Sequence, residues 1–185
     1  MSSLRASVRR GAGVGGVVLG VAAFTLPLLF GLTRDPRVTA SPLVGHRAPE
    51  FALPPLDGSH AVSLSDLKSR VVVVNFWASW CLECRQEHEA LAAAWARYRD
   101  RGVVLVGIPF QDTRSESLRY LAEVGGDWPQ LDDGGDRVAL DYGVTGVPET
   151  VLIAPDGTVA FRWVGPITYE DLSARIDGLL AKEDR

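Results

Sequence analysis

The only two cysteines of the chain, Cys81 and Cys84, stand two residues apart in the segment FWASWCLECRQEH, residues 76–88. Two thiols at this spacing can form a structural disulfide, hold a soft metal ion or exchange disulfides with a partner. A disulfide across two intervening residues closes too short a loop to constrain the unfolded chain much. The spacing therefore favours the third use, in which a thiolate attacks the disulfide of another molecule.

The residues around the pair predict different roles for the two thiols. Residues 71–76, VVVVNF, indicate a buried central strand, and a helix to about Arg101 should follow the pair. Cys81 then lies where the strand ends and the helix begins, so free N–H groups and the helix dipole favour its thiolate. Cys84 lies one turn inside the helix and is expected to be more buried. We predict that Cys81 attacks and that Cys84 resolves the mixed disulfide.

The other patterns predict an α/β sheet around these elements. A second apolar run, residues 103–108, follows the helix, so the two strands should be parallel partners in a βαβ unit. Capping patterns at Thr113 and Thr168 open two more helices, and a short helix is expected near residues 136–142. An Asp-Gly turn at residues 156–157 predicts a hairpin. The expected hairpin strands are residues 149–154 and 158–164.

An uncharged stretch, residues 11–33, precedes this domain and follows three arginines. A helix of that length spans a hydrocarbon core of about 30 Å, and the basic cluster keeps the N-terminus cytoplasmic. A signal peptide cleaved near residues 38–40 is the alternative, although its apolar region would usually be shorter. The predicted parts are a cytoplasmic N-terminus at 1–10, a single transmembrane anchor at 11–33 in the cytoplasmic membrane, a linker at 34–44, and a periplasmic domain at 45–185.

The chain has 185 residues, with 19 basic and 23 acidic side chains and a net charge of −4. Without the apolar N-terminus its length suits one domain. There is no basic excess of the kind that nucleic-acid binding requires.

Several motifs resemble those of known oxidoreductases. NFWASWCLEC is similar to the active-site strand and turn of thioredoxin-fold proteins, and YGVTGVPET, residues 142–150, to their cis-proline loop. GHRAPEFALPPLDG, residues 45–58, resembles the N-terminal extension of the membrane-anchored branch, which includes ResA and TlpA. Together with CRQEH and RWVGPIT, they resemble the CcmG/DsbE thiol:disulfide interchange proteins of cytochrome c maturation. The resemblance implies a thioredoxin-like fold with an N-terminal extension and a βαβ insertion.

The resemblance also implies a substrate-binding surface beside the cysteines. Pro148 should be cis, and Val147 should offer backbone groups to an extended partner strand. Trp80 should shield the sulfur and provide an apolar contact. Glu149 contacts the partner, tunes the site or is a solvated strand end. The other four tryptophans are expected to be packing residues.

Glu87 is predicted to be a third catalytic residue. Many thioredoxins carry a buried aspartate six residues before the first cysteine, where this chain has Asn75, which cannot accept a proton. Glu87 is three residues after Cys84 and therefore beside it on the helix, and the family has a glutamate at this offset. A partly buried carboxyl has a raised pKa, which suits proton transfer near neutral pH. The alternative is an ordinary exposed helix glutamate.

The function that the resemblance implies is reduction of a disulfide in apocytochrome c or in a haem-ligation helper. A membrane thiol carrier of the DsbD or CcdA type would then re-reduce the Cys81–Cys84 disulfide, with no other cofactor and no metal. The negative charge of Glu83 between the cysteines opposes thiolate formation slightly, which favours a reductant.

Three other functions stay open. A general disulfide exchange protein or oxidase would have a different redox potential. A metal chaperone would use the two thiols, but the chain has only three histidines to complete a site. A peroxidase needs a threonine or serine three residues before its cysteine and a proline further upstream, where this chain has Ala78 and Val74.

Overall fold

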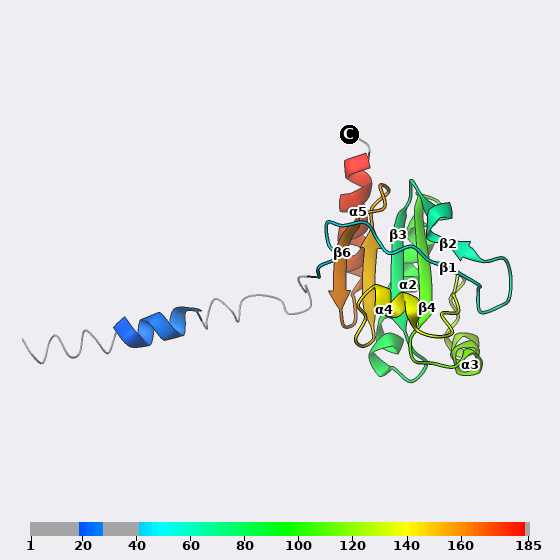
Figure 1. Cartoon of the computed structure of the whole chain (residues 1–185), viewed down its shortest axis with the longest axis horizontal. Coiled ribbons are helices and arrows are strands. Elements are labelled where there is room, and N and C mark those ends of the chain that lie inside the picture. Colours follow the sequence, from blue (N-terminus) through cyan, green and yellow to red (C-terminus); the bar gives the residue numbers. More distant parts are fainter. Residues whose placement is uncertain (1–18, 28–40, 184–185) are drawn as a thin grey trace, which may run out of the picture. The chain divides into compact units, whose positions relative to one another are not determined.

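The computed structural model describes residues 19–27 and 41–183 (Figure 1). Residues 19–27 form a helix. The predicted N-terminal part at 1–10, most of the predicted anchor and most of the linker lie outside the described residues. Within the described ranges, no helix is both long and apolar enough to cross a membrane. The second structural unit of the chain, Arg37–Arg185, contains all the elements discussed below.

A four-stranded sheet forms the centre of this unit. Its strands are β3 (Val71–Trp77), β4 (Val103–Pro109), β5 (Glu149–Ile153) and β6 (Val159–Val164). They lie in the order β4-β3-β5-β6. β3 and β4 are parallel, while β5 is antiparallel to both β3 and β6. The predicted parallel pair and the predicted hairpin are therefore confirmed.

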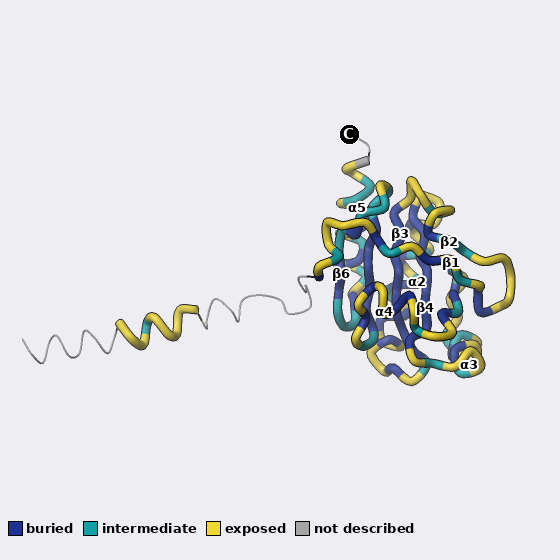
Figure 2. Tube along the Cα trace, in the orientation of Figure 1, coloured by how far each residue is buried: buried dark blue, intermediate teal, exposed yellow. Residues whose placement is uncertain are grey.

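Both faces of the sheet are covered, which explains the continuous apolar runs in β3 and β4. The long helices α2 (Leu82–Tyr98) and α5 (Tyr169–Glu183) lie on one face (Figure 1). The short helix α4 (Arg137–Asp141) and the N-terminal extension lie on the other. Figure 2 shows the strands as the most buried part of the unit. On β3, Val71 and Val73 pack with the long helices and Val74 with the opposite layer.

The N-terminal extension contains β1 (Ala52–Leu53), β2 (Val62–Ser63) and a 3₁₀ helix, η1 (Leu64–Leu67). β1 and β2 pair antiparallel as a small separate sheet. Before them, the chain makes a single bridge to the edge of the main sheet, where the Val159 N–H donates to the His46 carbonyl at 2.9 Å. The predicted extension is therefore part of the folded unit.

The expected βαβ insertion is present but is smaller than a full βαβ unit. Helix α3 (Arg114–Val124) follows β4, and its N-cap Thr113 accepts a hydrogen bond from the Glu116 N–H as predicted. The returning chain makes only an isolated parallel bridge, between Gly107 and Gln130. Pro129, directly before Gln130, has no N–H with which to continue the backbone hydrogen bonds to β4. The chain that returns from α3 therefore forms a bridge instead of a strand.

Tyr142 joins the extension to the sheet and supports a prediction about stability. Its buried hydroxyl donates to the Pro49 carbonyl at 2.8 Å, and its ring contacts Phe76. We expect Tyr142→Phe to lower the free energy of unfolding by about 1 kcal/mol because the buried carbonyl loses its partner. Denaturant unfolding of the oxidised chain measures this difference.

Tyr120 provides the matched control. Its hydroxyl is also buried but has no hydrogen-bond partner among the described residues. Tyr120→Phe should therefore leave the free energy of unfolding unchanged or slightly higher. Equal losses in the two variants would show that the Tyr142 hydrogen bond does not hold the extension.

Candidate active site

The two cysteines form a disulfide at the start of α2. Their Cα atoms are 5.3 Å apart, and the sulfurs are bonded. Cys81 is the N-cap residue of α2, and its Sγ accepts a hydrogen bond from the Cys84 N–H at 3.0 Å. The predicted position of Cys81, between the end of β3 and the first turn of the helix, is confirmed. A thiolate on Cys81 would lie at the positive end of the α2 dipole.

The expected difference in burial between the two cysteine residues is not present. Cys81 is 4% exposed and Cys84 is 3% exposed. Cys81 is covered because its Sγ lies 3.7 Å from the Val147 carbonyl oxygen, which belongs to a loop far away in the sequence. Cys84 instead lines a small internal cavity of about 10 Å³, with Asn75 and His88 among its neighbours. The two cysteines differ in their surroundings and not in the exposed fraction of the residue.

Glu87 lies on the buried face of α2 and is 2% exposed, so the alternative of an exposed helix glutamate is wrong. Its carboxyl oxygens accept hydrogen bonds from Asn75 Nδ2 at 2.8 Å and from the Ile167 N–H at 3.0 Å. Burial raises the pKa of Glu87 from its usual 4.5 to about 7, although these two hydrogen bonds oppose the rise. The predicted raised pKa is confirmed, and Glu87 is half ionised near neutral pH.

Asn75 has a positioning role that the sequence did not indicate. Its side-chain amide donates to Glu87 Oε1 and also to Thr150 Oγ1 on the neighbouring strand, at 3.1 Å. The two bonds fix the amide between β3 and β5. Asn75 stands where many thioredoxins have a buried aspartate. It therefore holds Glu87, the residue that is expected to accept the proton in place of that aspartate.

Trp80 is exposed directly before the disulfide, with 61% of its surface accessible. Its indole Nε1 donates to the Gln111 carbonyl at 3.1 Å. The preceding residue, Ser79, donates through its N–H to Asp112 at 2.7 Å, which holds the turn against the start of α3. Leu82 is 67% exposed on the other side of Cys81. Cys81 therefore has an exposed apolar residue on each side of it in the sequence.

The other tryptophans pack in the interior, as expected. Trp77, Trp128 and Trp163 are buried, and Trp95 of α2 is partly buried and packs against the core between the sheet and the long helices.

The loop between α4 and β5 faces the disulfide. The Val147–Pro148 peptide bond is cis, as the resemblance implied. The Val147 carbonyl oxygen of this loop lies 3.7 Å from Cys81 Sγ. The loop thus brings backbone groups to the attacking sulfur from a position 66 residues further along the chain.

The structure corrects the expectation for Glu149. Its side chain is 1% exposed, so it is not a solvated strand end, and its carboxylate does not face a surface where a partner could bind. The carboxylate forms an ion pair with Arg162 of β6 and accepts a hydrogen bond from the Thr145 N–H at 3.2 Å. The sequence analysis did not single out Arg162. Its inward position in the apolar run TVAFRWV was the available signal, since an arginine there requires a buried partner.

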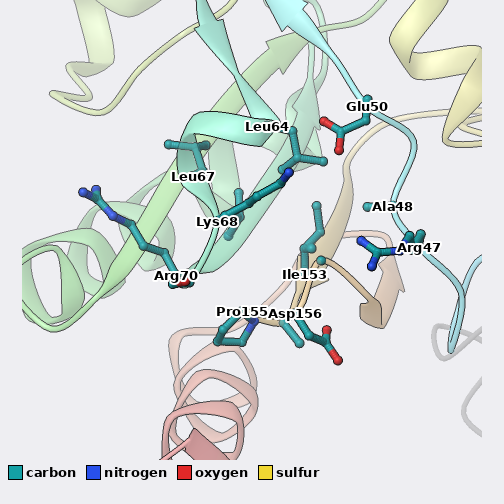
Figure 3. Close-up of a pocket in the computed structure, with 14 residues that line it drawn as sticks. Arg47, Ala48, Glu50, Leu64, Leu67, Lys68, Arg70, Ile153, Pro155 and Asp156 are labelled. Carbon is teal, nitrogen blue, oxygen red and sulfur yellow. The ribbon is translucent and has the colours of Figure 1, made fainter.

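A surface cavity of about 310 Å³ lies at the other end of β3 from the disulfide (Figure 3). Its lining includes Val72 near the start of β3 and the β5–β6 turn, and none of the predicted site residues. Charged side chains of both signs surround it, among them Arg47, Glu50 and Asp156. Across the described residues there is no cluster of three or more His, Cys, Asp or Glu side chains able to hold a metal ion.

Comparison with known proteins agrees with this geometry. Residues 44–162 match the AhpC/TSA family. The chain is 38% identical to the thiol:disulfide interchange protein DsbE of Allochromatium vinosum, over 90% of each chain. It is 36% identical to the interchange protein HelX of Rhodobacter capsulatus, over 80% of this chain and 82% of that one.

The crystal structure of a putative DsbE from Chlorobium tepidum superposes with a TM-score of 0.67 at 32% identity, covering 72% of this chain and 95% of that chain. The fold is therefore thioredoxin-like, and Cys81 and Cys84 are its CxxC pair. The chain belongs to the DsbE/HelX group of thiol:disulfide interchange proteins and is a thiol:disulfide oxidoreductase.

Proposed function

We propose that the protein is anchored in the cytoplasmic membrane by one helix and reduces disulfides on the periplasmic side. Its client would be apocytochrome c, at the two thiols that must be free before haem attaches, or a haem-ligation helper. The names of the DsbE and HelX relatives support this proposal. The observation that carries it is the position of Cys81, at the first turn of α2 and 3.7 Å from the Val147 carbonyl. There an attacking thiolate meets a loop that can pair with an extended client.

The reaction begins with the dithiol form. The Cys81 thiolate, stabilised by the Cys84 N–H and the α2 dipole, attacks one sulfur of the client disulfide and releases the other as a thiolate. Cys84 then transfers its proton to the Glu87 carboxylate, and its thiolate attacks Cys81 Sγ. The two client thiolates take up one proton from Glu87 and one from the solvent, so the client leaves as a dithiol and the protein is left with the Cys81–Cys84 disulfide and an ionised Glu87. Two electrons have moved from the protein to the client.

The oxidised protein must then be reduced again. A membrane thiol carrier of the DsbD or CcdA type would supply two electrons and two protons, because the compartment itself is kept oxidising. Glu83 is exposed in the first turn of α2, where its charge disfavours the thiolate slightly. A less stabilised thiolate makes the couple more reducing, which agrees with this direction of electron flow.

The client would bind across the exposed apolar surface around the disulfide. Trp80 and Leu82 offer apolar contacts on either side of Cys81, and the Val147 backbone can pair with an extended segment as an added strand. An unfolded apocytochrome segment satisfies this requirement more easily than a disulfide inside a folded protein.

A peroxidase is not favoured, although the family match includes the AhpC/TSA name. Ala78 is buried three residues before Cys81, where peroxide chemistry requires a hydroxyl. General disulfide exchange or oxidation remains the second candidate, and identification of the clients separates it from the proposal.

Trapping of the mixed disulfide tests the client. We expect full-length Cys84→Ser, produced in cells that make c-type cytochromes, to remain covalently bound to apocytochrome c or its helper, because no thiol resolves the intermediate. Mass spectrometry of the disulfide-linked species identifies what is bound, and Cys81→Ser should capture nothing. Capture of many unrelated secreted proteins would replace the proposal with general disulfide exchange.

A second prediction concerns proton transfer to Glu87. In Glu87→Gln, we expect release of the mixed disulfide to slow about a hundredfold, since general base catalysis contributes at least that much. The wild-type rate should rise with an inflection near pH 7, the pKa of Glu87, and the variant should lack this inflection. Stopped-flow measurement from pH 5 to 9 gives both quantities. Glu89→Gln, an exposed glutamate on the same helix, is the control. Identical pH profiles for wild type and Glu87→Gln would remove Glu87 from the mechanism.

The same carboxyl makes stability depend on pH. Its pKa is higher in the folded protein, about 7, than its usual 4.5, so the folded state binds this proton more tightly. The resulting stabilisation is complete below pH 4.5 and is lost as pH rises through 7, by up to about 3 kcal/mol. We expect Glu87→Gln to gain stability relative to wild type over this window. Urea unfolding at several pH values measures the difference, and parallel curves would contradict the raised pKa.

A further inference from the structure

The guanidinium of Arg162 binds three separate segments from a buried position. Arg162 is 9% exposed, and its Nε donates to Glu149 Oε2 at 2.8 Å. Its Nη2 donates to the same oxygen and to the Gly143 carbonyl, the latter at 2.7 Å. Its Nη1 donates to Ser41 Oγ at 3.3 Å. One side chain therefore joins the strand after the Val147–Pro148 loop, the chain before that loop, and Ser41, the first residue of the second described range, which lies within the predicted linker.

The register of the sheet brings the ion pair together. Val151 is paired with Arg162 and Glu149 with Val164, so Glu149 and Arg162 are diagonal neighbours on one face of the hairpin. That face also carries Val151 and α4, which keeps water away from the charges. The second oxygen of Glu149 accepts the Thr145 N–H at 3.2 Å. Both charged groups therefore have their hydrogen bonds satisfied inside the protein, as a buried pair requires.

These contacts hold the Val147–Pro148 loop at both of its ends. Gly143 lies four residues before Val147, and Glu149 lies two residues after it. Thr145, inside the loop, is bound to the Glu149 carboxylate. The Val147 carbonyl oxygen lies 3.7 Å from Cys81 Sγ. This distance depends on a loop whose two ends are held by Arg162.

We propose that Arg162 is a positioning residue for client binding, which acts through Glu149 and Gly143 on the backbone of Val147. This inference rests on the proposed function, in which Val147 pairs with an extended client segment. Among the described residues, no hydrogen bond or ion pair of Arg162 is to either cysteine, so any effect on the reaction is indirect and the loop is its route in this proposal.

Stability alone does not require an arginine here. Well-packed apolar side chains often replace a buried ion pair without loss of stability. A guanidinium has a planar fork of five donors, which can bind a carboxylate and a carbonyl at the same time. A lysine would keep the charge but not this fork, so it could not hold Gly143 and Glu149 together in the same geometry. The arginine therefore suits a role that depends on the position of the loop.

The test uses the full-length chain in detergent, in its reduced form, with Arg162→Met and Arg162→Lys. The double variant Glu149→Gln/Arg162→Met removes both charges, so that no unpaired carboxylate is left buried if the single variants fold poorly. Arg137→Met is the matched control, because it removes an arginine from an exposed ion pair, with Asp141, on nearby α4.

Two measurements separate the inference from the proposed function on which it rests. Amide hydrogen exchange over residues 143–149 reports how firmly the loop is held. The second measurement compares rates of reduction of a synthetic Cys-x-x-Cys-His peptide disulfide and of a small aromatic disulfide that has no backbone to pair with the loop.

We expect the Arg162 variants to exchange the Thr145 amide at least tenfold faster than wild type. They should also lose about ten- to a hundredfold in rate with the peptide, because small misplacements of a binding group have effects of this size. The rate with the small disulfide should be retained, and Arg137→Met should match wild type in all three measurements.

Unchanged exchange of the loop in the Arg162 variants would overturn the inference. Equal losses with the peptide and the small disulfide would also overturn it, since they indicate general damage to the fold. Faster exchange with an unchanged peptide rate would support Arg162 as the residue that fixes the loop, but would contradict strand pairing by Val147 in the proposed function.

Discussion

The hydrogen bond from the Cys84 N–H to Cys81 Sγ is the interaction on which the site depends. The bond forms because Cys81, a few residues after the end of β3, is the N-cap residue of α2. This position is usually occupied by a residue whose side chain carries an oxygen atom. A sulfur at that position accepts a hydrogen bond from an N–H group that has no partner within the helix. It also lies at the positive end of the helix dipole. The buried β3, held by strands on both sides, fixes where this helix begins. The fold thus gives only one of two chemically identical sulfurs the N-cap position, with a free N–H group and the positive end of a helix dipole beside it.

Two buried glutamates near the disulfide show how their surroundings give one residue type two roles. Among the described residues, Glu87 accepts hydrogen bonds from neutral groups, the Asn75 amide and the Ile167 N–H, and burial raises its pKa to about 7. Glu149 instead has the guanidinium of Arg162 beside it. A carboxyl without a cation can exchange a proton near neutral pH, whereas one that is paired with a cation is suited to holding structure. These two environments agree with the proposals made above, proton transfer by Glu87 and loop positioning through Glu149.

Local patterns in the sequence predicted most of the fold. The apolar runs of β3 and β4, the cap at Thr113 and the position of Cys81 depend on neighbours within a few residues, and the structure confirms them. Interactions between distant segments were not predictable in this way. The cover over Cys81 comes from Val147, and the partner of Glu149 comes from another strand, so both the burial of Cys81 and the orientation of Glu149 required the three-dimensional fold.

The low exposure of Cys81 has a consequence for selectivity. A client sulfur must approach within bonding distance of Cys81 Sγ, in a residue that is only 4% exposed and lies beside the Val147 backbone and next to Trp80 and Leu82 in the sequence. A disulfide in a flexible, extended segment can enter this space and pair with the loop at the same time. A disulfide buried in a folded protein cannot, because its own surroundings would collide with the exposed tryptophan. In the proposed function, this geometry lets a reductant work in an oxidising compartment without opening the structural disulfides of folded proteins, and the firmness of the Val147 loop sets how strongly the two kinds of client are distinguished.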